Sequence, residues 1–371
     1  MVFFQNHHNG CAGLNNHVIP YILCISLSNF LDRDFYFDHE LPCTTPPAFA
    51  LTGKLKDKFQ IIMSSPRSKV SDLVKIPNRR RSDVDRNTEN KISIPDVTNV
   101  FLSESDYFER IGTTPIKDFF PLGREPLIRQ ELQNFDLIEF GDKSLVNASY
   151  FYFLDPSAKN TLLDSITINY ADELELIAER ISNELGAFNA IHLRLGDFLD
   201  FYDHDGFSIN IDKFRRSINT VFPENDIPIL IATDDLEKKE LLQKLFGERQ
   251  IKFIDELIFS DFERSFLDLE FTDFNALSVI NQLICSNADQ FIGTCRSTFT
   301  SIIHRLRQER YGKTDFDFFP DRRTERLMGS DLRMKPDQHG FFDWNRYSAF
   351  SEYYAYPCWM REWNYDLTSL M

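Results

Sequence analysis

The sequence predicts an α/β protein with two parallel sheets, because short apolar strands alternate with amphipathic helices in two separate blocks. The first block runs from Val2 to Phe37 and the second from about residue 172 to Arg310. In the first, a strand, a glycine-bearing turn, a helix and another strand form a βαβ unit, which implies a parallel sheet. A chain of 371 residues is long enough for two domains of ordinary size.

The first block opens with a short apolar strand, Val2 to Phe4, and a polar turn that ends near Gly13. A helix is predicted next, because apolar residues recur near one helical face. These residues are Leu14, Val18, Tyr21, Ile22, Ile25 and Leu31. Asp32-Arg33-Asp34 ends the helical pattern, and Phe35 to Phe37 is predicted to form the next strand.

The stretch 66–93 is predicted to be a polar insertion. Pro77-Asn78-Arg79-Arg80-Arg81 leads there into a charged run with almost no apolar residue. Such a composition favours a solvated loop over a docking patch. The predicted organisation is an N-terminal Rossmann-like domain (1–165), a C-terminal Rossmann-like domain (166–325) and a tail (326–371). The tail should pack on the body through its aromatic residues, which include Trp344, Tyr353, Tyr354, Trp359 and Trp363.

The second block is predicted to alternate helices and strands up to Arg310. The expected helices are Leu174–Leu185 with Gly186 as C-cap, a segment around Ile211–Val221, Leu236–Phe246 capped by Thr233-Asp234-Asp235 and ended by Gly247, Ala276–Ile284 and Thr298–Arg310. The expected strands are Phe188–Leu195, Ile227–Ala232, Lys252–Ile254 and Gln290–Gly293.

Composition excludes several classes of protein. The net charge of −16 argues against a nucleic-acid binder, because such proteins rely on clustered Lys and Arg. The longest apolar runs stay below the 18 residues of a membrane span, and Met1 to Gln5 reads as a strand rather than a signal peptide. We therefore expect a cytoplasmic protein as the chain stands, or a secretory-lumen protein if a signal was removed. A single sequon at Asn147 favours secretion only weakly.

No metal site is predicted from the sequence. The six cysteines are scattered without a CxxC pair, which is typical of reduced core thiols, with one or two disulfides as the alternative for a secreted protein: Cys11, Cys24, Cys43, Cys285, Cys295 and Cys358. Asp203-His204-Asp205 is interpreted as a solvated loop. Neither a GxGxxG fingerprint nor a GxxxxGK[ST] loop is present, so a dinucleotide enzyme and a P-loop hydrolase are not supported.

The strand that ends at Leu195 carries the first candidate site. Side chains alternate along a strand, so His192 and Arg194 share one face while the apolar residues share the other. Ligands of open α/β folds bind at the carboxyl ends of parallel strands. Arg suits a diphosphate because its planar guanidinium donates two parallel hydrogen bonds. The local alternative is a salt bridge between Arg194 and Asp197.

Two further segments are candidate sites, and the first of them has anion-binding character. The strand ending in Gly293 is followed by Ser297 and Thr298 at a predicted helix start, where free N–H groups and the helix dipole attract anions. An ordinary Ser N-cap is the local alternative. The other segment is Gly13-Leu14-Asn15-Asn16, a turn after the first strand.

Together these motifs resemble the GDP-fucose protein O-fucosyltransferase family. Its members show a Gly-Leu/Phe-Asn turn, a His-x-Arg strand end with a nearby Asp, and a late Ile-Gly-Thr-x-x-Ser-Thr-Phe segment. This chain has Gly13-Leu14-Asn15, His192 to Asp197, and Ile292 to Phe299. Leu31 to Phe35 and Ile231-Ala232-Thr233-Asp234 also match family positions. The resemblance runs from residue 3 to about 312, with residues 45–165 poorly anchored.

The resemblance implies a GT-B fold, in which two Rossmann-like domains face a donor cleft. It also implies a metal-independent, inverting fucosyltransferase that uses GDP-fucose as donor substrate and needs no cofactor. By the same resemblance, Arg194 is the catalytic residue that stabilises the departing GDP. The implied donor-binding residues are Gly13, Asn15, Asn16, His192, Arg194, Asp197, Asp234, Asn281, Ser297, Thr298 and Phe299.

Two positions depart from the family pattern. Asn281 stands where relatives often place an Asp that pairs with guanine, and an amide accepts with one oxygen only. Ala12 stands where one branch has a Glu base, and His17 and Asp34 are conceivable substitutes. The acceptor is a Ser or Thr of a protein in one interpretation and a glycan in another. A third interpretation is a non-catalytic nucleotide-sugar-binding protein, and a structural module unrelated to nucleotides is a fourth.

Overall fold

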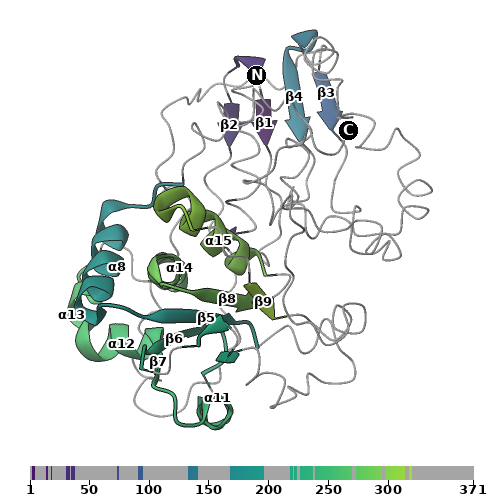
Figure 1. Ribbon diagram of the computed structural model, residues 1–371. Coiled ribbons are helices and arrows are strands. Elements are labelled where there is room, and N and C mark those ends of the chain that lie inside the picture. Colours follow the sequence, from purple (N-terminus) through teal and green to yellow (C-terminus); the bar gives the residue numbers. More distant parts are fainter. Residues whose placement is uncertain are drawn as a thin grey trace, which may run out of the picture. The chain divides into compact units, whose positions relative to one another are not determined.

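The computed structural model describes a subset of the chain, in two compact units that each contain a parallel sheet (Figure 1). The described residues are 2–4, 14–15, 18, 31–33, 35–37, 73–74, 91–94, 133–140, 168–195, 218–219, 221–223, 226–236, 239–269, 273–294, 297–313 and 317–319. The predicted α/β class with parallel sheets is confirmed. None of the helices within these ranges is long and apolar enough to cross a membrane.

The first unit contains four parallel strands in the order β2-β1-β4-β3. They are β1 (Val2–Phe4), β2 (Phe35–Phe37), β3 (Lys91–Ile94) and β4 (Leu137–Phe140). The predictions of β1 and β2 are confirmed, whereas β3 and β4 were not predicted. Within the range 66–93, where a polar insertion is predicted, Leu73 and Val74 are buried and β3 begins.

The second unit contains five parallel strands in the order β7-β6-β5-β8-β9. They are β5 (Asn189–Leu193), β6 (Ile229–Thr233), β7 (Ile251–Phe253), β8 (Phe291–Thr294) and β9 (Asp317–Phe319). Counted along the chain, this is the order 3-2-1-4-5 of doubly wound nucleotide-binding sheets. The strand order reverses between β5 and β8, and ligands of such sheets bind in the crevice at that point.

Helices cover both faces of the second sheet. They are α8 (Asp172–Leu185), α11 (Lys239–Phe246), α12 (Ile254–Asp261), α13 (Glu263–Leu267), α14 (Phe274–Asn287) and α15 (Thr298–Tyr311). Figure 1 shows α14 and α15 on one side of the sheet and α11 on the other. On the α11 side, Ile191, Leu193 and Leu195 pack in one buried cluster with Leu242 and Leu245. The predicted alternation along β5 is therefore confirmed.

One local prediction, the end of the strand β7, is wrong, and two others are only partly tested. Helix α11 is described from Lys239 to Phe246, and residues 237–238, where the predicted helix start and its cap would be tested, lie outside the described residues; the Asp234 carboxylate accepts a hydrogen bond from Leu195 N. Strand β7 ends at Phe253, and Ile254 opens α12, which was not predicted. The first helix is described only at Leu14, Asn15, Val18 and Leu31.

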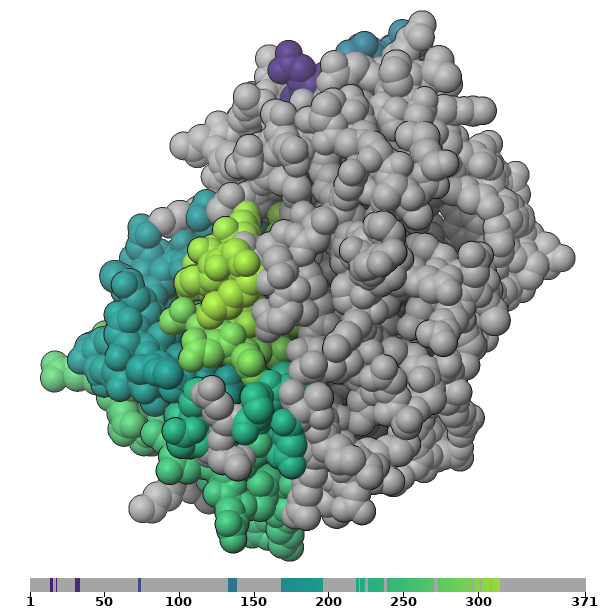
Figure 2. Space-filling model, in the orientation of Figure 1, coloured from purple at the N-terminus to yellow at the C-terminus, as the bar shows by residue number. Residues whose placement is uncertain are grey.

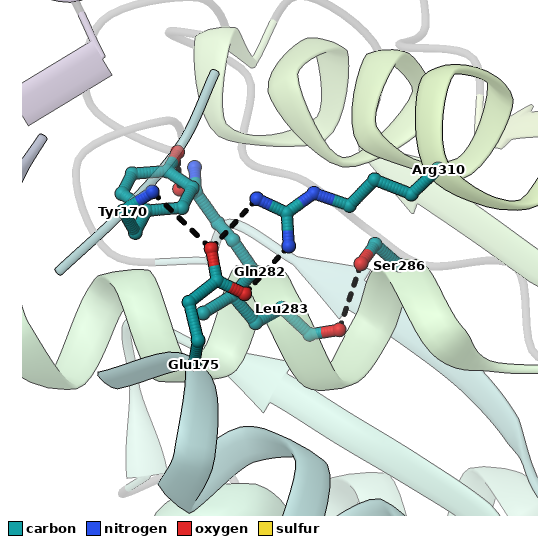
Figure 3. Close-up of polar contacts among 6 residues, drawn as sticks. All are labelled: Tyr170, Glu175, Gln282, Leu283, Ser286 and Arg310. Atoms are coloured by element: carbon teal, nitrogen blue, oxygen red, sulfur yellow. Dashed lines mark hydrogen bonds and ion pairs between the residues drawn. The ribbon is translucent and has the colours of Figure 1, made fainter. Parts of the chain in front are cut away.

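A polar cluster holds α8, α14 and α15 together (Figure 3). Arg310 on α15 forms a bidentate ion pair with Glu175 on α8, with Nη1 2.5 Å from Oε2 and Nη2 2.7 Å from Oε1. The Tyr170 hydroxyl donates to Gln282 Oε1 on α14, and the Tyr170 amide donates to Glu175. On the face shown in Figure 2, the surface of α8 (teal) adjoins that of α15 (yellow-green). These contacts fix α15, whose first turn lies at the candidate site.

Candidate functional site

The candidate site lies at the carboxyl ends of β5 and β8, where the strand order reverses. Thr294 joins these ends: its hydroxyl donates to His192 O at 3.0 Å and accepts from Arg194 N at 2.9 Å. On the other side, Asp234 after β6 accepts from Leu195 N at 2.6 Å. The backbone around Arg194 is therefore held from both neighbouring strands, which limits where its side chain can go.

His192 is buried against the first turn of α15. Its Nδ1 shares a hydrogen bond of 2.7 Å with Thr300 Oγ1, and its ring stacks on Phe299 at 4.5 Å between centroids. Burial, together with the smaller effect of the Arg194 charge, lowers the pKa of His192 to about 3. The imidazole is therefore neutral at physiological pH. His192 therefore lines the site as a rigidly held, uncharged ring and supplies no positive charge.

Gly293 lets α15 approach β8 closely. A Cβ built on Gly293 would lie 2.1 Å from Thr300 Cγ2, far inside normal contact. Only glycine therefore fits between the strand and the first turn of the helix. The close approach places the start of α15 directly beside the ends of β5 and β8.

The first turn of α15 has the character of an anion site. Ser297 directly precedes the helix and is fully buried, and its hydroxyl has no hydrogen-bond partner in the part of the chain that the structure describes. The first N–H groups of a helix lack intrahelical acceptors, and the helix dipole makes this end positive. No acidic residue stands in the first turn to repel an anion. A buried hydroxyl without a partner is costly, and a bound phosphate oxygen would satisfy it.

Most sequence-predicted residues of the second unit meet at this place. His192, Arg194, Asp234 and Ser297 to Phe299 all belong to the β5, β6 and β8 ends or to the start of α15. Asn281 lies elsewhere on the same sheet face, in the middle of α14, and is buried. Asn15 is buried in the first unit. Gly13, Asn16 and Asp197, together with Ala12, His17 and Asp34, lie outside the described residues.

Sequence reasoning missed two residues of the site. Thr294 and Thr300 make the hydrogen bonds that hold Arg194 and His192, yet their partners lie about a hundred positions away in sequence. The Ile-Gly-Thr segment contains Thr294, but nothing local shows that it spans two strands. Among the described residues, no group of three or more His, Cys, Asp or Glu could hold a metal ion.

Comparison with known proteins gives a distant relationship to fucosyltransferases. No protein-family model matches the chain. The chain is 27% identical over 152 residues to GDP-fucose protein O-fucosyltransferase 2 of Homo sapiens, and equally to that of Pan troglodytes. This match covers 40% of the chain and 33% of each relative. The chain thus aligns with about a third of the length of these curated relatives.

Solved structures of fucosyltransferases also match. The structure of POFUT1 in complex with GDP matches at a TM-score of 0.45 and 13% identity, covering 86% of this chain and 98% of that chain. NodZ α-1,6-fucosyltransferase soaked with GDP-fucose matches at a TM-score of 0.43 and 12% identity, covering 82% of this chain and 92% of that chain.

Proposed function

We propose that the protein is a GT-B fucosyltransferase that takes GDP-fucose as its donor and binds the diphosphate between Arg194 and the first turn of α15. The observation that carries this proposal is the fully buried Ser297 hydroxyl without a partner among the described residues. It lies at a helix start, next to the strand whose end carries Arg194. The distant relationship to GDP-fucose protein O-fucosyltransferase 2 supports fucose as the sugar.

The proposed reaction is a displacement at the anomeric carbon of fucose. The bond between that carbon and the β-phosphate oxygen breaks, and its electron pair leaves with GDP. The acceptor oxygen bonds to the carbon from the opposite face, and the acceptor's proton passes to a base or to water. Negative charge grows on the departing diphosphate. A fixed guanidinium and helix N–H groups aimed at that charge stabilise the transition state more than the ground state.

The acceptor belongs to the same proposal. We take it to be a Ser or Thr hydroxyl of a protein, because the matched relatives are named protein O-fucosyltransferases. The GT-B arrangement, with the boundary near residue 165, is likewise proposed. Arg194 supplies the positive charge that a metal ion supplies in other transferases, so turnover should persist in EDTA.

Release of GDP from GDP-fucose tests this function. Arg194→Ala should lower the rate by about 100-fold or more, the scale for removing one preorganised charge-stabilising donor. Arg194→Lys should keep an intermediate rate, because it keeps the charge but loses the planar pair of donors. Arg180→Ala is the matched control: Arg180 has a 64% exposed side chain on α8 and pairs with Glu184 in the same helix. An Arg194→Ala rate equal to that of Arg180→Ala would contradict the proposal.

A further inference from the structure

A buried carboxylate lies at the carboxyl end of β7, on the same side of the sheet as the candidate site. Asp255 is the second residue of α12 and follows β7 with one residue between. It is buried, and burial raises the pKa of its carboxyl to about 6. The displacement described above does not use it. Burying a carboxylate costs free energy unless its oxygens accept hydrogen bonds.

Asn281 on α14 supplies one of those donors. Its Nδ2 donates to Asp255 Oδ1 at 2.8 Å and to the Leu277 carbonyl at 2.9 Å. A backbone carbonyl can only accept, so this contact fixes which end of the amide is nitrogen. Both amide hydrogens are thereby used within the protein. What Asn281 can still offer a ligand is its carbonyl oxygen.

The pair therefore presents acceptors only. Within the described ranges, Asn281 is the side chain that donates a hydrogen bond to Asp255, and it does so to Oδ1. Asp255 Oδ2 and Asn281 Oδ1 can therefore each accept a hydrogen bond from a ligand. The exposed fraction is 8% for Asp255 and 5% for Asn281, so part of each residue is still accessible to a ligand. Two neighbouring acceptors match a ligand edge with two neighbouring N–H donors. Guanine has such an edge in N1–H and its exocyclic amine, whereas adenine offers one donor beside one acceptor.

Resting on the proposed function, we propose that Asp255, oriented by Asn281, recognises the guanine of the donor nucleotide. The carboxyl ends of β7 and β5 lie on the same side of the parallel sheet, two strand spacings or about 10 Å apart. An extended nucleoside diphosphate can bridge that separation, with its base near Asp255 and its phosphates near Ser297. The Asn at position 281 then does not weaken guanine selection, because the carboxylate is supplied from α12.

Calorimetry with GDP and IDP tests this assignment on the full chain, since IDP lacks only the exocyclic amine. The wild type should bind GDP at least about tenfold more tightly than IDP, the scale of one hydrogen bond to a charged group. In Asp255→Asn, the amide of residue 255 would turn a donor toward guanine. GDP affinity should fall by about tenfold, and the two nucleotides should bind about equally.

Asp273→Asn is the matched control. Asp273 is also a buried carboxylate, and it caps α14 by accepting from the Asn275 and Ala276 amides, a role that Asn also fills. This variant should keep the wild-type preference. A folded Asp255→Asn protein with an unchanged GDP-to-IDP ratio would overturn the inference, as would a wild type without preference. If the wild type bound neither nucleotide, the proposed function itself would fail.

Discussion

Gly293→Ala should damage both the fold and the site, because α15 packs on β8 at this position. The new Cβ would lie 2.1 Å from Thr300 Cγ2, 2.7 Å from its Oγ1 and 2.9 Å from its Cβ. Carbon atoms need about 3.5 Å. Either the first turn of α15 moves outward by roughly 1 Å, or Thr300 rotates and releases His192 Nδ1. Overpacking costs about 1–3 kcal/mol, and the release of the buried imidazole, where it occurs, adds a similar amount, so we expect a loss of roughly 1–6 kcal/mol.

Urea unfolding followed by circular dichroism measures this loss, and calorimetry measures the accompanying fall in GDP affinity. Gly312→Ala is the matched control: Gly312 has a φ of 62° with nothing near its Cβ position, so it should cost only about 1 kcal/mol of backbone strain. Thr300→Ala should partly rescue Gly293→Ala, since it removes the two closest atoms. A Gly293→Ala protein with the wild-type unfolding midpoint would refute the reasoning.

Two other predictions concern stability. Arg307 is fully buried and donates to the Ser286, Ala288 and Asp289 carbonyls at the end of α14, so Arg307→Leu should cost about 2–5 kcal/mol in urea unfolding. A cost no larger than that of Arg264→Ala, at a 95% exposed side chain, would be inconsistent with this. The carboxyl of Asp255 has a folded pKa of about 6, above its ordinary value of 3.8. The folded state therefore binds this proton more tightly than the unfolded state does. The resulting contribution of Asp255 to the free energy of unfolding is present below about pH 4 and is lost as pH rises to about 6. The stability of the wild type relative to Asp255→Asn should fall by about 3 kcal/mol across that range, and a constant difference would count against it.

The parts of the fold that could be predicted from the sequence have strong local signals. Strand β5 shows a buried apolar run, and α8 shows a regular apolar face that ends at Gly186, whose φ of 68° suits glycine. Helix α12 gave no such signal, because it follows β7 without a turn and its N-cap, Phe253, makes no side-chain cap. Strand β9 begins with the charged Asp317 and is followed directly by Pro320, so the sequence around it shows no strand pattern.

The candidate site was predictable only in part for the same reason. Arg194 and Ser297 lie at a strand end and a helix start, which local sequence can indicate. The Asp255–Asn281 hydrogen bond joins residues 26 positions apart on two helices, and only the packing of α12 against α14 brings them together. Asp234 was assigned to a helix cap because its Thr-Asp-Asp context is typical of caps. Its contact with Leu195 N depends on the pairing of β5 with β6.

Calorimetry of the wild type with GDP and with guanosine tests the diphosphate site most directly. If Arg194 and the start of α15 hold the diphosphate, GDP should bind at least about 100-fold more tightly than guanosine, because charge-assisted hydrogen bonds to phosphate contribute several kcal/mol together. Ser297→Ala should reduce that ratio by about tenfold, since it removes one buried donor. Equal affinities for GDP and guanosine in the wild type would contradict the assignment of this edge of the sheet to the diphosphate.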